Sequence, residues 1–168
     1  MANIASHRCM SESMKASRPI LLERTVARRN VRFEKRGASL GLTVRNTPEL
    51  ISEVERGFAF AAVRWLSSYT GLNVAVLASV IDLPERTLAR RRTSGKFAPE
   101  ESERLLRISN IFERAVELFE GDVVAAVKWL TTPKKALNSQ PPLLYSRTEV
   151  GAREVENLIG RLEHGVFS

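Results

Sequence analysis

The chain has 168 residues, of which 43% are hydrophobic and 27% are charged, close to the averages of globular proteins. This length suffices for one ordinary domain or two small helical ones, and the composition excludes a wholly disordered or fibrous chain. The formal net charge of +7 lies within residues 1–46, where ten Lys and Arg residues outnumber three Glu residues. This segment is either a solvated tail or an arm that contacts nucleic-acid phosphates.

The cysteine content and the apolar runs bear on the compartment. The single cysteine, Cys9, has no partner for an internal disulfide. No apolar run reaches the roughly 18 residues that cross a bilayer, and the leader lacks the apolar region of a secretory signal. We therefore expect a cytoplasmic protein with no membrane association. The alternative is a transit peptide, because the leader shares an Arg-rich composition with such peptides. Met10 and Met14 are alternative translation starts.

Residues 1–46 show no sustained apolar period, and residues 37–41 are typical of a loop, so we expect a flexible leader and linker. A helix start follows at residues 47–49, with a threonine cap, a proline and an acid in the first turn. Apolar residues then recur at three- and four-residue steps, which predicts one helix from Thr47 to about Tyr69. The stripe consists of Leu50, Ile51, Val54, Phe58, Ala61, Ala62, Trp65 and Leu66.

Residues 72–95 have the spacing of a helix-turn-helix. A first helix, a tight turn at residues 82–84 and a second helix opened by Pro84 account for the positions of the apolar residues. Asp82 stands where such motifs often place Gly, and Asp adopts the left-handed backbone more readily than most residues. Leu88 is expected to point into the core, which leaves Glu85, Arg86, Thr87, Arg90 and Arg91 on the outer face.

The second helix of this motif carries cations without an acid after Glu85. Arginine at the outward positions of a recognition helix can make bidentate contacts to guanine, and cations at the helix end can meet phosphates. The alternative is a solvated cationic face near a helix C-terminus, which the helix dipole favours. The predicted DNA-binding residues are Arg86, Thr87, Arg90, Arg91, Arg92 and Lys96.

Three further helices are expected after Gly95. A capped start at residues 97–101 begins a long amphipathic helix that runs to about Glu120. Its exposed face is expected to hold Glu103, Arg104, Arg107, Glu113, Arg114 and Glu117. Shorter helices follow at Val123–Leu130 and Thr148–Leu162. The proline-rich residues 138–142 between them are expected to lack regular structure, and the pattern allows one short extended piece at Leu143–Tyr145.

The pattern contains none of the common catalytic motifs. His7 and His164 lie far apart in the sequence, and neither has a Cys or carboxylate partner at ligand spacing. A Gly-rich phosphate loop, a nucleophile elbow and an HExxH pair are all absent from the sequence. We therefore expect no enzyme, with no catalytic residue, no metal and no cofactor.

The C-terminal stretch has a series of residues that keep their order and spacing to the last positions. They are Trp129-Leu130, Pro133, Ala136-Leu137, Pro142-Leu143, residues 148–152, Val155-Glu156, residues 158–161, Glu163 and residues 165–167. This series resembles the toxin-binding domain of Xre/MbcA/ParS-type antitoxins. Upstream, residues 87–91, 101–107 and 115–119 resemble the helical body of the same family, so the resemblance covers about residues 50–168. The chain departs from the family at Asn138-Ser139, where members often have Gly-Gly, and at residues 144–146.

The resemblance implies an all-α fold with an Xre-like helix-turn-helix domain and a small helical toxin-binding domain. We accordingly expect a flexible leader at 1–46, a DNA-binding and dimerisation domain at 47–120 and a toxin-binding domain at 121–168. The resemblance also implies a cognate RES-domain toxin that depletes NAD and whose active-site entrance the antitoxin's C-terminal segment obstructs. A homodimer, a larger hetero-oligomer with the toxin and repression of the pair's own promoter through operator DNA are further implications.

The residue pattern of the last helix is typical of a helix that packs on its own domain and also binds a partner. Its apolar residues Val155, Leu158 and Ile159 are expected to pack on the rest of the domain. The aromatic residue near the C-terminus, Phe167, can fill a pocket of a partner, and charged residues can surround that contact. The predicted toxin-binding residues are Glu149, Arg153, Glu156, Arg161, Glu163, His164, Val166, Phe167 and Ser168. The alternative function is a stand-alone helix-turn-helix transcription regulator whose C-terminal region only dimerises.

Overall fold

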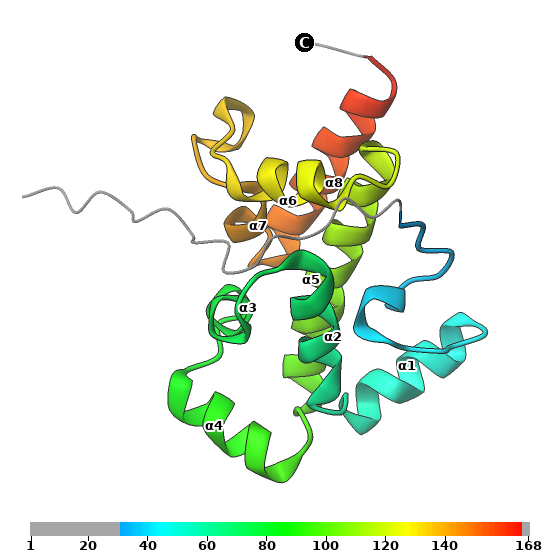
Figure 1. The fold of residues 1–168 in the computed structure, drawn as a ribbon, viewed down its shortest axis with the longest axis vertical. Coiled ribbons are helices and arrows are strands. Elements are labelled where there is room, and N and C mark those ends of the chain that lie inside the picture. Colours follow the sequence, from blue (N-terminus) through cyan, green and yellow to red (C-terminus); the bar gives the residue numbers. More distant parts are fainter. Residues whose placement is uncertain (1–30, 166–168) are drawn as a thin grey trace, which may run out of the picture.

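The computed structural model describes residues 31–165, which form a helical fold without a β-strand in that range (Figure 1). The all-α fold predicted from the sequence is therefore confirmed. The helices are η1 (Ala38–Leu40), α1 (Thr47–Arg56), α2 (Ala61–Thr70), α3 (Val74–Val80), α4 (Glu85–Ser94), α5 (Pro99–Leu118), α6 (Val123–Thr131), η2 (Lys135–Leu137), α7 (Pro142–Tyr145) and α8 (Glu149–Glu163). None of them is long and apolar enough to cross a membrane.

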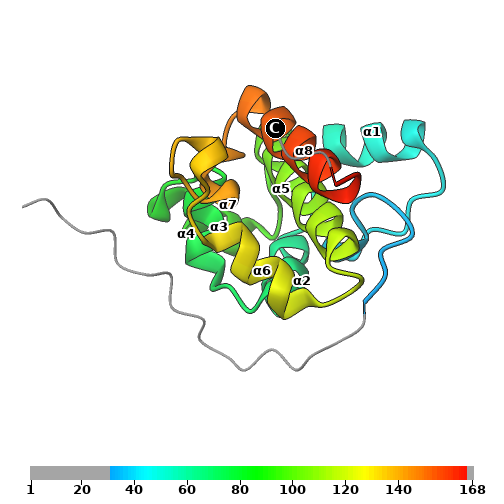
Figure 2. The ribbon, with the colours of Figure 1, turned by 90° about the horizontal axis from the view of Figure 1, so that it is seen from above.

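The long helix α5 forms the centre of the fold. Helices α1, α6 and α8 and the short η1 all pack against it, as the two views of the ribbon show (Figures 1 and 2). Its core face includes Leu105, Ile111 and Phe112, which are almost completely buried. Burying a side chain of this size contributes about 1.5–3 kcal/mol, so the core face of α5 stabilises the packing of the helices around it.

The single helix expected over residues 47–69 is wrong, because the chain forms α1 and α2 with a break at residues 57–60. Gly57 has φ 76° and ψ 134°, a backbone conformation that strongly favours glycine. A Cβ atom there would also collide with the Phe97 carbonyl oxygen. Phe58 and Phe60 on this break pair with residues 95–97, with Phe97 N–H donating to Phe58 O at 2.9 Å and Phe60 N–H to Gly95 O at 2.8 Å.

The apolar stripe expected on that helix is only partly buried. Phe58, Ala62 and Leu66 are core residues, whereas Ile51 and Trp65 are each about half exposed. The break turns α1 and α2 relative to one another, so residues that would share one stripe on a continuous helix no longer share it. The helix also starts differently at its N-terminus, since the Asn46 side chain accepts the Glu49 N–H at 2.9 Å and acts as the cap in place of Thr47.

The loop expected at residues 37–41 is wrong, because this segment forms η1 and enters the core. Ser39 and Leu40 are buried, and η1 contacts both α2 and α5. Farther upstream, the Phe33 ring packs edge-on to Tyr69 with ring centroids 5.4 Å apart. Residues 31–46 are therefore part of the folded body. The expectations for residues 1–30, including those on His7, Cys9, Met10 and Met14, lie outside the described residues.

The C-terminal helices begin where the capping pattern predicts. The Asp122 side chain accepts the Ala125 N–H at 3.0 Å at the start of α6, and Thr148 accepts the Gly151 N–H at 3.1 Å at the start of α8. The extended piece allowed at Leu143–Tyr145 is wrong, since these residues belong to the short helix α7. Between α6 and α7, Asn138 and Ser139 both have a left-handed backbone, with φ 52° and 58°.

Candidate functional site

Helices α3 and α4 form the helix-turn-helix that the spacing predicts. Leu83 N–H donates to Ala78 O at 2.9 Å, which closes the turn, and Asp82 has φ 56° at the position where glycine is common. The apolar side chains between the two helices are buried, including Leu88 on α4. The Arg104 guanidinium of α5 donates to the Ile81 carbonyl oxygen at 3.0 Å and so holds the turn against the central helix.

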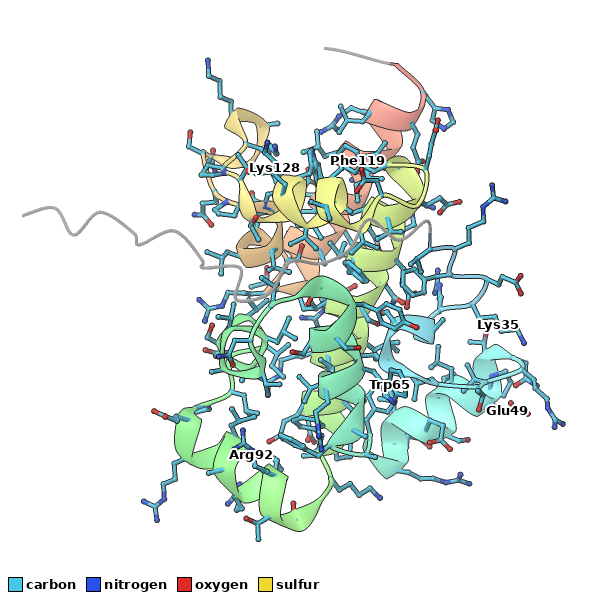
Figure 3. All side chains as sticks on the ribbon, viewed as in Figure 1. Lys35, Glu49, Trp65, Arg92, Phe119 and Lys128 are labelled. Atoms are coloured by element: carbon cyan, nitrogen blue, oxygen red, sulfur yellow. The ribbon has the colours of Figure 1, made fainter. Side chains whose placement is uncertain are left out.

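Helix α4 lies at one end of the molecule, and most of its cations face away from the core (Figures 1 and 3). Arg86, Arg90, Arg92 and Lys96 are exposed, and Thr87 is partly buried. The Arg92 guanidinium lies over the Phe60 ring, 5.8 Å from its centroid. This cationic end can meet phosphates and base edges of a nucleic-acid duplex, because guanidinium groups match both acceptors.

Arg91 does not lie with the exposed cations, in contrast to its expected place on the outer face of α4. Its Nε and Nη2 atoms donate to the two carboxylate oxygens of Glu101 at 2.7 and 2.9 Å. Burial by itself raises the pKa of the Glu101 carboxyl. The hydrogen bonds from Arg91 and from the Ala98 N–H outweigh this effect, so that the pKa lies below its ordinary value. Glu101 also raises the pKa of Arg91 through the same hydrogen bonds, so both groups stay charged at neutral pH.

Helix α8 presents one face to the core and the other to solvent. Val155 and Ile159 are buried against the rest of the fold and Leu158 is partly buried, which confirms their expected packing. The predicted partner-binding residues within the described range are exposed, and some of them flank the core face beside α5: Glu149, Arg153, Glu156, Arg161, Glu163 and His164. Val166, Phe167 and Ser168 lie outside the described residues.

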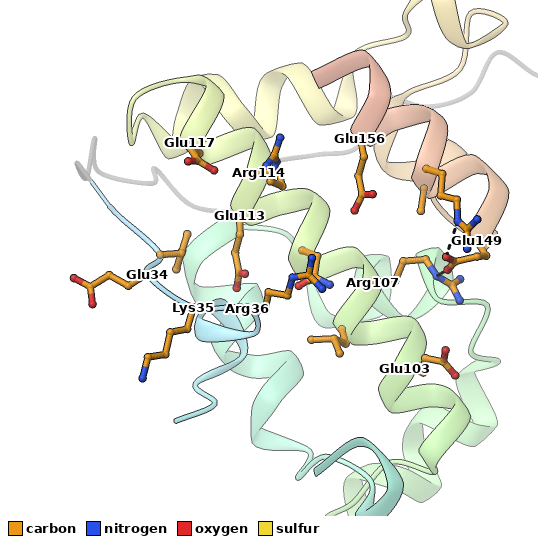
Figure 4. Close-up of a pocket in the computed structure, with 15 residues that line it drawn as sticks. Glu34, Lys35, Arg36, Glu103, Arg107, Glu113, Arg114, Glu117, Glu149 and Glu156 are labelled. Atoms are coloured by element: carbon orange, nitrogen blue, oxygen red, sulfur yellow. Dashed lines mark hydrogen bonds and ion pairs between the residues drawn. The ribbon is translucent and has the colours of Figure 1, made fainter. Parts of the chain in front are cut away.

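Ion pairs connect α8 to α5 along a groove between these two helices and residues 33–36 (Figure 4). Glu149 accepts hydrogen bonds from Arg107 at 3.1 Å and from Arg153 at 3.2 Å. Glu163, near the end of α8, pairs with Arg114 at 3.1 Å. These contacts fix the long axis of α8 relative to α5, so the exposed face of α8 is held in a defined orientation.

Glu113 on α5 is buried, although the helical pattern places it on the exposed face. Its carboxylate accepts hydrogen bonds from the Ser39 hydroxyl at 2.7 Å and from the N–H groups of Ser39 and Gly37 at 2.8 and 3.2 Å. Burial raises the pKa of this carboxyl above its ordinary value, and the hydrogen bonds only partly offset the effect. Glu113 therefore attaches the N-terminal segment to α5.

The two candidate surfaces are far apart but lie on one rigid set of helices. Helix α4, which carries the exposed cations, is at one end of the long axis, and the C-terminal end of α8 is at the other (Figure 1). The start of α8 nevertheless approaches the helix-turn-helix, because Arg147 pairs with Asp82 at 2.8 Å. Across residues 31–165, no group of three His, Cys, Asp or Glu side chains is placed to hold a metal ion.

The α3-turn-α4 unit, with its exposed cations and its support by α5, defines a helix-turn-helix protein. Two family models match the chain: the antitoxin Xre-like helix-turn-helix domain over residues 49–110, and the antitoxin Xre/MbcA/ParS C-terminal toxin-binding domain over residues 114–165. An "Antitoxin Xre" of Yersinia enterocolitica is 40% identical over 130 residues, which cover 77% of this chain and 88% of that protein. Another "Antitoxin Xre", of Photorhabdus laumondii, is 30% identical over 131 residues with the same coverage.

The chain belongs to the Xre/MbcA/ParS antitoxin family. Its helix-turn-helix and toxin-binding domains are those of an antitoxin that binds DNA and pairs with a toxin. The match to both domains spans the elements that carry the two surfaces, since α4 lies within the first match and α8 within the second.

Three residues that position these surfaces were missed from the sequence: Ser39, Glu101 and Glu113. Glu101 had one usable signal, because an acid at the third helical position after Ala98 is typical of a capping box. The Glu101 carboxylate does accept the Ala98 N–H at 2.8 Å. Ser39 and Glu113 are separated by 74 residues, and local spacing carries no signal for such a contact.

Proposed function

We propose that the protein neutralises a RES-domain toxin that depletes NAD, by placing its C-terminal segment across the entrance of the toxin's active site. We further propose that it binds operator DNA through α4 and represses the promoter of the toxin–antitoxin pair. The observation that supports this proposal best is the placement of the α4 cations and the C-terminal end of α8 at opposite ends of one fold (Figure 1). A single molecule can therefore hold toxin and DNA at the same time.

The proposed DNA surface consists of Arg86, Thr87, Arg90, Arg92 and Lys96. Arg86, Arg90 and Arg92 are exposed on α4 and Lys96 is exposed just after it, at one end of the fold, which favours contact with a duplex. In a helix-turn-helix the N-terminal part of the recognition helix contacts base edges, so Arg86 and Arg90 would read bases. Arg92 and Lys96, near the end of the helix, would contact phosphates. Because operator DNA lies in the bacterial cytoplasm, the protein would act in that compartment.

The proposed toxin surface is the exposed side of α8 together with the tail. Arg153, Glu156, Arg161 and His164 would form a polar rim, and Phe167 would be the apolar anchor. Glu149 and Glu163 are on the same side, but their carboxylates are engaged by Arg107 and Arg114 of α5. We infer that these two residues orient α8 and contribute to toxin contact through that orientation.

A homodimer fits the proposed operator binding. Two copies related by a two-fold axis would present their α4 helices to half-sites about 34–36 Å apart, one turn of the DNA helix. Each copy would leave its α8 end available for one toxin, which gives the larger hetero-oligomer. Because each α4 makes only a few base contacts, the paired half-sites would supply most of the sequence preference.

The experiment that tests the proposal is co-expression of the chain with its proposed cognate RES-domain toxin. Neutralisation predicts that the two proteins co-purify, that cells survive and that intracellular NAD stays at its normal level. A chain that binds its promoter but neither co-purifies with the toxin nor protects cells would instead be a stand-alone transcription regulator. In that case the C-terminal region would serve dimerisation only.

A further inference from the structure

We propose that Arg91 is a positioning residue for DNA recognition, which acts by holding α4 against Glu101 and makes no contact to DNA itself. This inference rests on the proposed operator binding by α4 and deepens it. It divides the cations of α4 into two groups with different roles. Arg86 and Arg90 face outward for direct contact, and Arg91 faces the protein.

The ion pair occupies one of the two guanidinium edges through which Arg91 could contact a base. Nε and Nη2 form this edge, which can make parallel hydrogen bonds to two acceptors. Both atoms donate to Glu101, at 2.7 and 2.9 Å. The O6 and N7 atoms of guanine require a similar two-atom edge, so this edge of Arg91 cannot bind guanine while the ion pair exists.

The burial of the pair favours the structural role. The side chain of Glu101 is 8% exposed and that of Arg91 is 22% exposed, so most water is excluded from the contact. If Arg91 turned toward DNA, the Glu101 carboxylate would be left buried without its cation, which is strongly unfavourable. Glu101 is itself fixed, because it also accepts the Ala98 N–H at 2.8 Å at the start of α5.

Helix α4 needs such a contact because it has little apolar surface in the core. Leu88 is its buried residue. Arg91 follows Leu88 by three positions and so lies on the same side of the helix, one turn nearer the C-terminus. Leu88 and Arg91 thus attach successive turns of α4 to the body. Without the ion pair the second half of the helix could change its angle, and the base-reading side chains would move with it.

The positioning role and direct DNA contact by Arg91 predict opposite effects of Glu101→Gln on DNA affinity. Replacing Glu101 with Gln removes a negative charge close to the DNA surface and frees Arg91. If Arg91 contacted phosphate or guanine directly, Glu101→Gln would strengthen DNA binding. If Arg91 acts through Glu101, the same substitution weakens specific binding despite the more favourable net charge.

The test uses the full chain and two labelled duplexes of equal length: the region upstream of its own gene and a scrambled sequence. Affinity is measured over a range of salt concentrations for Glu101→Gln, Arg91→Lys and the matched control Arg90→Gln. Misplacing α4 should cost the equivalent of one bidentate base contact, an approximately 5- to 150-fold loss for the promoter duplex. Both Glu101→Gln and Arg91→Lys should show this loss. The slope of log affinity against log salt concentration should stay unchanged in both variants.

The control variant Arg90→Gln should differ from the other two variants in its salt dependence or in its sequence preference. Arg90→Gln should lower the slope of log affinity against log salt by about 0.9 if Arg90 meets one phosphate, or lower promoter preference if it meets a base. Amide hydrogen exchange supplies a readout independent of DNA. The amides of the second half of α4 should exchange faster in Glu101→Gln and Arg91→Lys, while those of α5 and α8 remain protected.

Tighter promoter binding by Glu101→Gln, or unchanged exchange and affinity in both variants, would overturn the positioning role. If Arg91→Lys alone loses affinity and Glu101→Gln does not, Arg91 contacts DNA directly, which also overturns it. A wild-type chain that shows no preference for the promoter duplex would refute operator binding itself. Faster exchange in α4 would still establish the anchoring contact in that case, so the two failures are distinguishable.

Discussion

The hydroxyl of Ser39 and the carboxylate of Glu113 lie 2.7 Å apart, and this contact joins the N-terminal segment to the central helix. Because burial raises the pKa of Glu113, the folded protein holds the proton more tightly than the unfolded chain does. The contribution of protonated Glu113 to stability is therefore complete below the ordinary glutamate pKa, and it is lost as the pH rises through the folded-state pKa of Glu113.

We predict that this pH dependence disappears in Glu113→Gln. The difference in unfolding free energy between wild type and the variant should shift in favour of the variant as the pH rises from just below 4.5. Urea unfolding at a series of pH values measures this difference, and taking the difference cancels the titration of the other carboxyls. A difference that is constant across the series would mean that Glu113 titrates alike in the folded and unfolded states.

Two truncations should differ sharply in stability. Removing residues 1–46 deletes Leu40, whose burial contributes about 1.5–3 kcal/mol, and leaves the buried Glu113 without its hydrogen-bond donors. Removing residues 1–30 keeps both contacts. Thermal unfolding of the two truncated proteins should show a much lower midpoint for the longer deletion. Equal midpoints would contradict the structural role of residues 31–46.

The pair Asn138-Ser139 gives a prediction about the connection before α7. Both residues have a left-handed backbone, with φ 52° and 58°. Ser139→Gly should stabilise the protein by about 0.5–1 kcal/mol, because relief of left-handed strain exceeds the entropic cost of glycine. Asn138→Gly should change stability little, since asparagine tolerates this conformation. Denaturant midpoints that fall in Ser139→Gly would argue against this backbone geometry.

The helix-turn-helix and the last three long helices were predictable because their signals are local. Asp122 and Thr148 mark helix starts through side-chain caps, Pro84 directly precedes α4, and Leu88 lies at the apolar position that the motif requires. Each of these signals depends on residues within four positions of one another. The family resemblance also rested on such local series, and both family models match the chain.

The break at Gly57 was not predictable from periodicity. The apolar residues Val54, Phe58 and Ala62 continue the helical spacing across it, and a single glycine costs a helix only about 1 kcal/mol. What ends α1 is the pairing of Phe58 and Phe60 with residues 95–97, a contact made nearly forty residues away. Local propensity carries no information on such a partner.

The sequence reveals the division of the α4 cations only in part. Arg91 follows the buried Leu88 by three positions and so shares its side of the helix, whereas Arg90 does not, but this spacing names no partner for Arg91. Only the position of α5, which starts after the turn at Gly95, brings Glu101 to Arg91. The helix-turn-helix that carries the candidate DNA surface was thus predictable, whereas the ion pair of Arg91 depended on tertiary packing.

The intracellular NAD level in cells that express the RES-domain toxin together with a tail variant is the most direct test of the proposed neutralisation. The variant replaces Phe167 with Asp or removes residues 165–168, and promoter binding by the purified variant is the control. A charge at position 167 would have to enter an apolar pocket unpaired, so NAD should collapse and cells should die while promoter binding persists. NAD that stays high, with the cells protected, would contradict obstruction of the toxin's active site by the tail.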